Sequence, residues 1–299
     1  MRDEPQSLTL AEGRLAALAW GDPEAPTWLA LHGWLDNAAS FSRLAPRLVE
    51  ARKIRVLALD FPGHGHSAPR PEGTDYALWD NCHAVLDALD ELGLAAAPLL
   101  AHSMGAGVAC LVAAALPERV ERLMLIDGIG SLTTPAEEVA QQLRKGLLGH
   151  RRPSSPSPRY PDAATALAAR VAGGVTPIDT ETAEPLVARN LAPTAEGRVR
   201  LRTDGRLLRP SLVRLSPEQS RAMLKSIEAP TLLVEGEAGI LGRRAHAEQA
   251  RQALRGLERR VLPGGHHLHL EPDAVDAVAE AILAWWATRD ESQRVQEAP

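Results

Sequence analysis

One stretch, Ala97–Leu116, constrains the fold of this chain more than any other. It reads APLLAHSMGAGVACLVAAAL: a short apolar run ends in the turn HSMG (102–105) and passes into small residues typical of a helix. A nucleophile elbow requires this order of strand, tight turn and helix, because the turn lifts one side chain above the end of the sheet. Ser103 is therefore a candidate nucleophile.

The turn departs from the usual elbow pattern at one position. That pattern has glycine two residues before and two residues after the nucleophile. Gly105 satisfies the second place, whereas Ala101 occupies the first. Alanine is still small, so the elbow interpretation holds beside its alternative, in which Ser103 only caps the following helix.

Apolar runs that end in turn residues alternate with helical patterns along the chain. This alternation predicts an α/β protein with a mostly parallel sheet and helices on both faces. The expected strands are Leu15–Trp20, Thr27–Leu31, Arg55–Leu59, Pro98–Ala101, Arg122–Ile126, Thr231–Val234 and Arg260–Leu262, and the expected helices outside the elbow include Ala38–Ala51, Tyr76–Leu92 and Val275–Trp286, with a frayed tail from Arg289.

The pattern changes between about Gly130 and Arg214. Prolines punctuate this segment, helical pieces are expected at Pro135–Leu148 and Ala163–Val171, and Arg198–Arg209 alternates arginine with apolar residues as a solvated hairpin does. We therefore expect a core domain of residues 1–129 and 215–299 and an inserted helical lid of residues 130–214. The Leu, Val and Ala content of the insertion favours a mainly apolar substrate.

Composition excludes several classes of protein. The 299-residue chain has a net charge of −5, which argues against nucleic acid or an anionic membrane surface as the partner. The two cysteines form no disulfide framework, and the N-terminal MRDEPQSLTL is too polar for a signal peptide. Leu92–Leu116 carries no Lys, Arg, Asp or Glu, but glycine, proline and histidine interrupt it, so it is interpreted as a strand and a helix rather than a membrane span. A cytoplasmic monomer or homodimer is expected.

A serine nucleophile needs a base, and the late segment GGHHLHLE (264–271) supplies histidines in a loop after the last expected strand. Together with HGW (32–34), DFPGHGHS (60–67) and HSMG (102–105), this loop resembles the α/β-hydrolase superfamily. The motifs stand in the family order over roughly residues 10–286. HGWLDN (32–37) and GGHHLHLE look most similar to the serine hydrolase-like subgroup.

The resemblance implies that Ser103 attacks a substrate carbonyl and that His266 accepts its proton. It also implies an oxyanion hole made by the backbone N–H groups of Trp34 and Met104. His267 is the alternative base, and His269 is expected in the core. A metal site made of the three histidines in this loop is disfavoured, because no carboxylate or cysteine set with ligand spacing accompanies them, and no cofactor is expected.

The acid of the triad is where the sequence departs from the family. Its usual place is the turn after Thr231–Val234, which here reads GEAG (236–239) and has glycine at the expected aspartate position. Asp127, at the end of the preceding core strand, is the favoured acid. Glu237 is the alternative, and an incomplete triad is a third.

Other polar residues have structural interpretations. Asp60 is expected to tie the turn that follows it through backbone hydrogen bonds. His32 and His102 are expected to brace neighbouring backbone rather than react, and Asp36 to cap the next helix rather than touch substrate.

The sequence therefore predicts a cofactor-independent serine hydrolase that cleaves a carboxylic ester, or a similar acyl bond, of a small molecule. Thioester and carbon–carbon bond hydrolysis use the same triad and are the alternatives among enzymes. Epoxide hydrolases and haloalkane dehalogenases, which the same fold includes, are disfavoured because they carry aspartate where this chain has Ser103. A catalytically silent binding protein with the same fold is the alternative outside enzymes.

Overall fold

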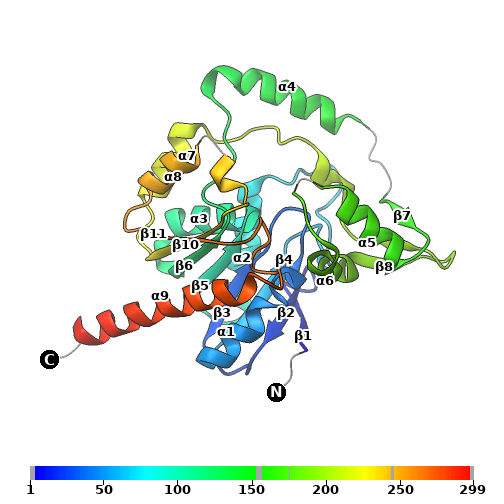
Figure 1. The fold of residues 1–299 in the computed structure, drawn as a ribbon. Helices are drawn as coiled ribbons and strands as arrows, with labels where there is room; N and C mark the ends of the chain where they lie inside the picture. The colour runs from blue at the N-terminus through cyan, green and yellow to red at the C-terminus, as the bar shows by residue number, and fades with distance from the viewer. Residues whose placement is uncertain (1–3, 153–156, 175, 244–245, 297–299) are drawn as a thin grey trace.

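A central eight-stranded sheet organises the chain in the computed structural model, which describes residues 4–152, 157–174, 176–243 and 246–296 (Figure 1). The strand order is β1-β2-β4-β3-β5-β6-β10-β11. The strands are β1 (Gln6–Leu10), β2 (Leu15–Trp20), β3 (Thr27–Leu31), β4 (Arg55–Asp60), β5 (Ala97–His102), β6 (Val120–Ile126), β10 (Thr231–Gly236) and β11 (Glu258–Leu262). From β4 to β11 every pair is parallel, while β2 is antiparallel to both β1 and β4. The predicted α/β class is confirmed, and β1 is an addition that the sequence did not reveal.

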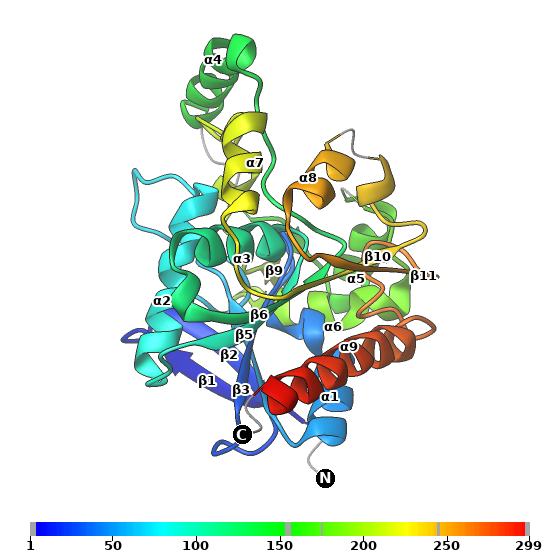
Figure 2. The same cartoon turned by 90° about the vertical axis from the view of Figure 1, so that its left-hand side faces the viewer.

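Two apolar layers sandwich the sheet, because alternate residues of each buried strand point to opposite faces. In β3, Leu29 and Leu31 join one core cluster, whereas Trp28 and Ala30 join the other. The first face is covered by α2 (Asn81–Glu91), α3 (Met104–Ala115), α7 (Pro217–Lys225) and α8 (Ala247–Ala253), and the second by α1 (Leu44–Arg52) and α9 (Val275–Gln296) (Figure 2).

The closing helix α9 is longer than predicted. It continues to Gln296 and does not fray at Arg289. Ion pairs hold this part of the helix to the core: Arg289 pairs with Glu258, and Asp290 pairs with Arg52 (2.6 Å) and Arg122 (3.0 Å).

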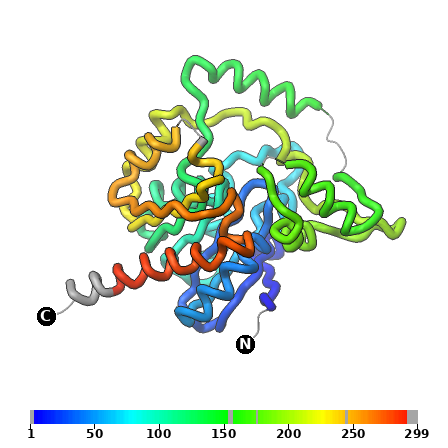
Figure 3. Tube along the Cα trace, in the orientation of Figure 1, coloured from blue at the N-terminus to red at the C-terminus, as the bar shows by residue number. Residues whose placement is uncertain are grey.

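The segment between β6 and α7 lies outside the eight-stranded sheet (Figure 3). It contains α4 (Val139–His150), α5 (Ala163–Ala172), α6 (Thr180–Asn190) and a three-stranded sheet of β7 (Arg159–Tyr160), β9 (Val199–Leu201) and β8 (Leu191–Pro193). In Figures 1 and 2, α4 lies at the outer edge of the molecule.

The expected hairpin at Arg198–Arg209 is wrong. Val199–Leu201 pairs with β7 and β8 instead, and Gly205–Leu208 is a 3₁₀ helix rather than a second hairpin strand. The Asp204 side chain accepts the Arg206 N–H and starts a 3₁₀ turn, while its own N–H donates to the Gly63 carbonyl of the core (2.9 Å). These hydrogen bonds occupy the backbone N–H groups of Asp204 and Arg206, which the second strand of a hairpin would need for pairing.

The uncharged stretch Leu92–Leu116 is divided between β5 and α3, as predicted. No helix in the described ranges is long and apolar enough to cross a membrane. Cys82 and Cys110 are both free.

Candidate active site

A strained turn presents Ser103 between β5 and α3. Its backbone has φ 51° and ψ −111°, a region that residues with a side chain rarely adopt. The close packing behind it requires glycine at 105, because a Cβ there would lie 2.2 Å from the Leu31 carbonyl oxygen. Ala101 does not prevent this geometry. The Ser103 side chain makes no capping hydrogen bond to α3, so the capping alternative is wrong.

A continuous hydrogen-bonded chain joins Ser103, His266 and Asp127. His266 Nε2 lies 3.0 Å from Ser103 Oγ, and His266 Nδ1 lies 2.6 Å from Asp127 Oδ2. A carboxylate beside Nδ1 favours the tautomer with the proton on Nδ1, which leaves Nε2 to accept a hydrogen bond from the Ser103 hydroxyl. His266 is 8% exposed and Asp127 is fully buried, whereas Ser103 is half-buried.

Asp127 reaches the histidine from the end of β6. Its N–H donates to Val234 of β10, its Oδ2 accepts the Ile240 N–H (2.8 Å), and its backbone has φ 39°. The glycine that replaces the expected aspartate makes room for this side chain: a Cβ at Gly239 would lie 2.4–2.6 Å from the carboxyl atoms of Asp127. The two positions for an acid are thus mutually exclusive.

Glu237 lies apart from this chain of contacts. Its side chain is exposed, and no hydrogen bond or ion pair found within the described ranges involves it. Only its backbone is engaged, because its N–H donates to the Leu262 carbonyl (2.9 Å).

The loop after β3 and the start of α3 carry the two N–H groups expected in an oxyanion hole. Within the described part of the chain, neither the Trp34 nor the Met104 N–H donates to a protein acceptor. Met104 opens α3, where helix geometry leaves N–H groups unpaired. The loop is strained at Leu35 (φ 64°), and the Trp34 indole donates to Leu207 of the inserted segment (3.2 Å).

A second carboxylate–histidine pair lies beside the first. His267 Nε2 is 3.1 Å from Asp36 Oδ2, and His102 Nδ1 is 3.6 Å from the same oxygen. His267 therefore contacts Asp36 and not Ser103. The expectation that Asp36 caps the next helix is wrong, because Asn37 accepts the Ala39 N–H at that turn (3.0 Å).

Burial and neighbouring groups act in opposite directions on the Asp36 carboxyl. Burial raises its pKa, but His267, His32 and Arg170 together more than offset this effect, and the pKa lies below its usual value. Burial and the neighbouring His269, His266 and His267 bring the pKa of His102 well below its usual value, so that its ring is neutral.

The remaining polar residues brace the loops around the site. His32 Nε2 accepts the Phe61 N–H (3.0 Å), and His102 Nε2 lies 2.8 Å from the His266 carbonyl. Asp60 accepts the N–H groups of Ala38 and His66. The core position of His269 is confirmed, since its ring is fully buried.

Two further residues have roles that the sequence did not reveal. Glu271 accepts the Gly265 N–H with both carboxylate oxygens (3.0 and 2.9 Å) and so holds the turn before His266. Arg189 of α6 forms a buried ion pair with Asp60 (2.8 Å). The only sequence signal for Glu271 was its place at the end of the motif GGHHLHLE (264–271). No motif around Arg189 indicated its ion pair with Asp60.

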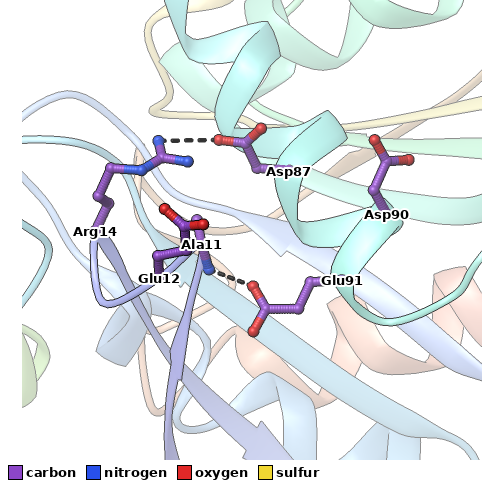
Figure 4. Close-up of a pocket in the computed structure, with 6 residues that line it drawn as sticks. All are labelled: Ala11, Glu12, Arg14, Asp87, Asp90 and Glu91. Carbon is purple, nitrogen blue, oxygen red and sulfur yellow. Dashed lines mark hydrogen bonds and ion pairs between the residues drawn. The ribbon is translucent and has the colours of Figure 1, made fainter.

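A surface hollow lies between the β1–β2 turn and α2, lined by Ala11, Glu12, Arg14, Asp87, Asp90 and Glu91 (Figure 4). Arg14 pairs with Asp87 there (3.1 Å). None of the predicted site residues lines this hollow.

Comparison with known proteins agrees with this architecture. A sequence model of the α/β-hydrolase fold family matches residues 26–152. A serine hydrolase-like protein of Dictyostelium discoideum is 32% identical over 281 residues, which cover 86% of this chain and 74% of that protein. Human serine hydrolase-like protein 2 is 28% identical over 302 residues, 92% of each chain.

Solved structures extend the match over nearly the whole chain. A hypothetical protein from Pseudomonas aeruginosa PAO1 has a TM-score of 0.85 at 43% identity and covers 95% of this chain and 99% of its own. A thioesterase domain from the curacin biosynthetic pathway has a TM-score of 0.80 at 30% identity, with coverage of 94% and 99%.

The sheet order, the elbow and these matches define an α/β-hydrolase fold. The chain belongs to the α/β-hydrolase superfamily, and within it to the serine hydrolase-like group. Both the fold and the relatives support hydrolase activity.

Proposed function

We propose that this chain is a serine hydrolase that cleaves a carboxylic ester or a similar acyl bond through an acyl-enzyme on Ser103. The observation that carries the proposal is the unbroken chain of contacts from Ser103 Oγ through His266 to Asp127 (3.0 and 2.6 Å). A hydroxyl, an imidazole and a buried carboxylate in this order are the parts that nucleophilic acyl transfer needs.

In the proposed reaction, Ser103 Oγ attacks the carbonyl carbon while His266 Nε2 accepts its proton. Asp127 holds the ring in orientation and stabilises the imidazolium that forms. His266 then returns the proton to the departing alcohol. A water molecule attacks the acyl-enzyme by the same proton path and releases the acid.

The negative charge on the carbonyl oxygen would be stabilised by the N–H groups of Trp34 and Met104. Their lack of another acceptor in the described residues supports this role. Removing one such donor costs about 3–4 kcal/mol of transition-state stabilisation in comparable enzymes.

Residues 130–214 would form a lid over the same edge of the sheet. Three contacts support this placement: Leu186 O accepts from Asn37 Nδ2 (2.8 Å), Leu207 O from the Trp34 indole, and Asp204 N–H donates to Gly63. These core partners lie in the loops that follow β3 and β4, on the side of the sheet where Ser103 stands. Apolar side chains of the insertion would bind an apolar acyl group and exclude water.

The direct test is hydrolysis of p-nitrophenyl esters of increasing chain length by the wild type and by Ser103→Ala, with fluorophosphonate labelling of both. We expect turnover and labelling by the wild type and neither by Ser103→Ala. A wild type that neither hydrolyses an ester nor takes up the label would favour the catalytically silent binding protein.

A thioesterase is the second candidate, favoured by the 30% identity to the curacin thioesterase domain. A matched pair of substrates, an oxygen ester and a thioester with the same acyl chain, separates the two. A kcat/KM for the thioester well above the one for the ester would make thioester cleavage the better description. Labelling without turnover of either would direct the search to carbon–carbon bonds. A cytoplasmic location and a monomeric or dimeric state stay predictions.

A further inference from the structure

Three buried side chains from separate segments lie close together beside His266 and could bind a metal ion. Asp36 lies in the loop after β3, His102 ends β5, and His267 lies in the loop after β11. They are 5%, 0% and 2% exposed, and one ligand atom from each lies within 4.8 Å of the other two. Far apart in sequence, these residues meet only in the folded chain.

The hydrogen bond of His102 leaves one of its ring nitrogens for an ion. Its Nε2–H donates to the His266 carbonyl (2.8 Å), so Nδ1 is the nitrogen that faces the group. This Nδ1 has no hydrogen-bond partner in the described chain, and it lies 3.6 Å from the carboxylate oxygen of Asp36. A buried polar atom without a partner calls for an explanation, and a cation held by both side chains supplies one.

The donor set suits a transition-metal ion. Zinc binds imidazole nitrogen and carboxylate oxygen at about 2.0–2.2 Å, which places neighbouring donors of a tetrahedral site about 3.3 Å apart. The distances from Asp36 Oδ2 to His267 Nε2 (3.1 Å) and to His102 Nδ1 (3.6 Å) lie on either side of this value. His267 can offer Nε2 by moving its proton to Nδ1, which also has no partner among the described residues.

The backbone packs closely against two of these donors. A Cβ at Gly33 would lie 2.9 Å from His102 Nδ1 and 3.0 Å from Asp36 Oδ2. Any residue larger than glycine at this position would therefore displace the two ligand atoms.

We propose that Asp36, His102 and His267 bind a divalent transition-metal ion such as Zn²⁺, and that occupancy of this site slows the hydrolase. His267 directly follows His266, and His102 holds the His266 carbonyl. Metal bonds would fix His102 and His267 on one ion and so constrain the backbone of His266 between them. A displacement of about 1 Å in such a site costs roughly 100-fold in rate. The binding part stands alone, while the inhibition part rests on the proposed function.

The binding part is tested on untagged protein, freed of metal with a chelator and titrated with ZnCl₂ against a chromophoric competitor. Bound zinc is counted after gel filtration. We expect one Zn²⁺ per chain, and a Kd at least about 100-fold higher in Asp36→Asn and in His267→Gln. His150→Gln is the matched control, because it removes a histidine beside another carboxylate, Asp75 (3.3 Å), and should keep the wild-type Kd.

Thermal unfolding provides a second readout that does not depend on activity. Zinc should raise the Tm of the wild type and of His150→Gln, but not that of the two site variants, because an ion that binds only the folded chain stabilises it. Absence of stoichiometric binding, or an unchanged Kd in both folded site variants, overturns the site.

The inhibition part is measured as ester hydrolysis across the same titration. We expect a loss of at least about tenfold whose midpoint matches zinc binding and which a chelator reverses. Zinc binding with an unchanged rate refutes the inhibition and leaves the site. A wild type without acyl hydrolysis refutes the proposed function, while the titration and the melting curves still decide on the site.

Discussion

His266 and His267 are adjacent in sequence and each contacts a buried carboxylate, but the surroundings give them different chemistry. Both nitrogens of His266 are engaged, Nδ1 by Asp127 and Nε2 by Ser103. His267 contacts Asp36 through Nε2, and its Nδ1 makes no hydrogen bond in the described chain. A carboxylate–histidine pair can activate a nucleophile only when the second nitrogen faces the group to be activated, such as a hydroxyl. The first pair has a hydroxyl in that place, whereas the second joins the loop after β3 to the loop after β11.

Changing the carboxylate of the first pair should have the largest effect. We expect Asp127→Asn to lower kcat by about 10⁴-fold, because the amide favours the wrong imidazole tautomer. Ester hydrolysis and circular dichroism of the purified variant measure activity and folding. Glu237→Gln is the control and should stay within about twofold of the wild type. A large loss in Glu237→Gln would move the acid to the later strand.

Crowding the same carboxylate should have a smaller effect. In Gly239→Ala the new Cβ overlaps the Asp127 carboxyl atoms, and we expect kcat to fall by about 100-fold as the side chain is displaced.

The reverse experiment transfers the acid to the position usual in the family. In an Asp127→Ala background, Gly239→Asp should restore activity by at least about tenfold, since the space left by one carboxylate admits the other. A double variant no more active than Asp127→Ala would show that the two positions are not equivalent. Steady-state kinetics of the single and double variants decide between these outcomes.

Changing the carboxylate of the second pair should affect the stability of the fold more than the rate of hydrolysis. We expect Asp36→Asn to lower kcat by less than about tenfold, while the free energy of unfolding falls by about 1–3 kcal/mol through loss of a charged buried hydrogen bond. Urea unfolding and ester hydrolysis measure the two effects. A loss of kcat as large as that of Asp127→Asn would contradict the separation of roles.

His64 is a buried histidine outside both pairs. We expect its replacement to have the smallest effect on activity but a clear effect on the pH dependence of stability. Burial, helped by His32, lowers the pKa of His64 to about 3, whereas an imidazole in the unfolded chain has a pKa of about 6.5. Between these values the unfolded chain binds a proton that the folded chain does not, so stability falls as the pH falls through this window.

At pH 5 this difference amounts to about 2 kcal/mol from His64 alone. Chemical unfolding of the wild type and of His64→Gln between pH 7 and 5 should show a shallower loss in the variant. His83→Gln, which removes an exposed histidine of α2, is the control and should keep the wild-type slope. Equal slopes in all three proteins would contradict a neutral, buried His64.

Local pattern was enough to predict most of the sheet and the elbow. Strands β3 to β6 and β10 are apolar runs that end in turn residues, and the small residues after Ser103 allow α3 to pack closely behind the turn. Each of the motifs around Trp34, Ser103 and His266 consists of a few consecutive residues. The motifs and their order along the chain could therefore be recognised without a structure.

Contacts between distant residues were decided only by the tertiary structure. The sequence left Asp127 and Glu237 as alternative acids, and nothing local related Gly239 to Asp127 or Asp36 to His267. The sequence also could not show that α9 continues past Arg289, or that Asp204 binds the core instead of turning a hairpin, because ion pairs and hydrogen bonds to remote segments determine both. Chain neighbours determine local conformation, but the distance between two side chains on different strands depends on how the whole sheet is assembled.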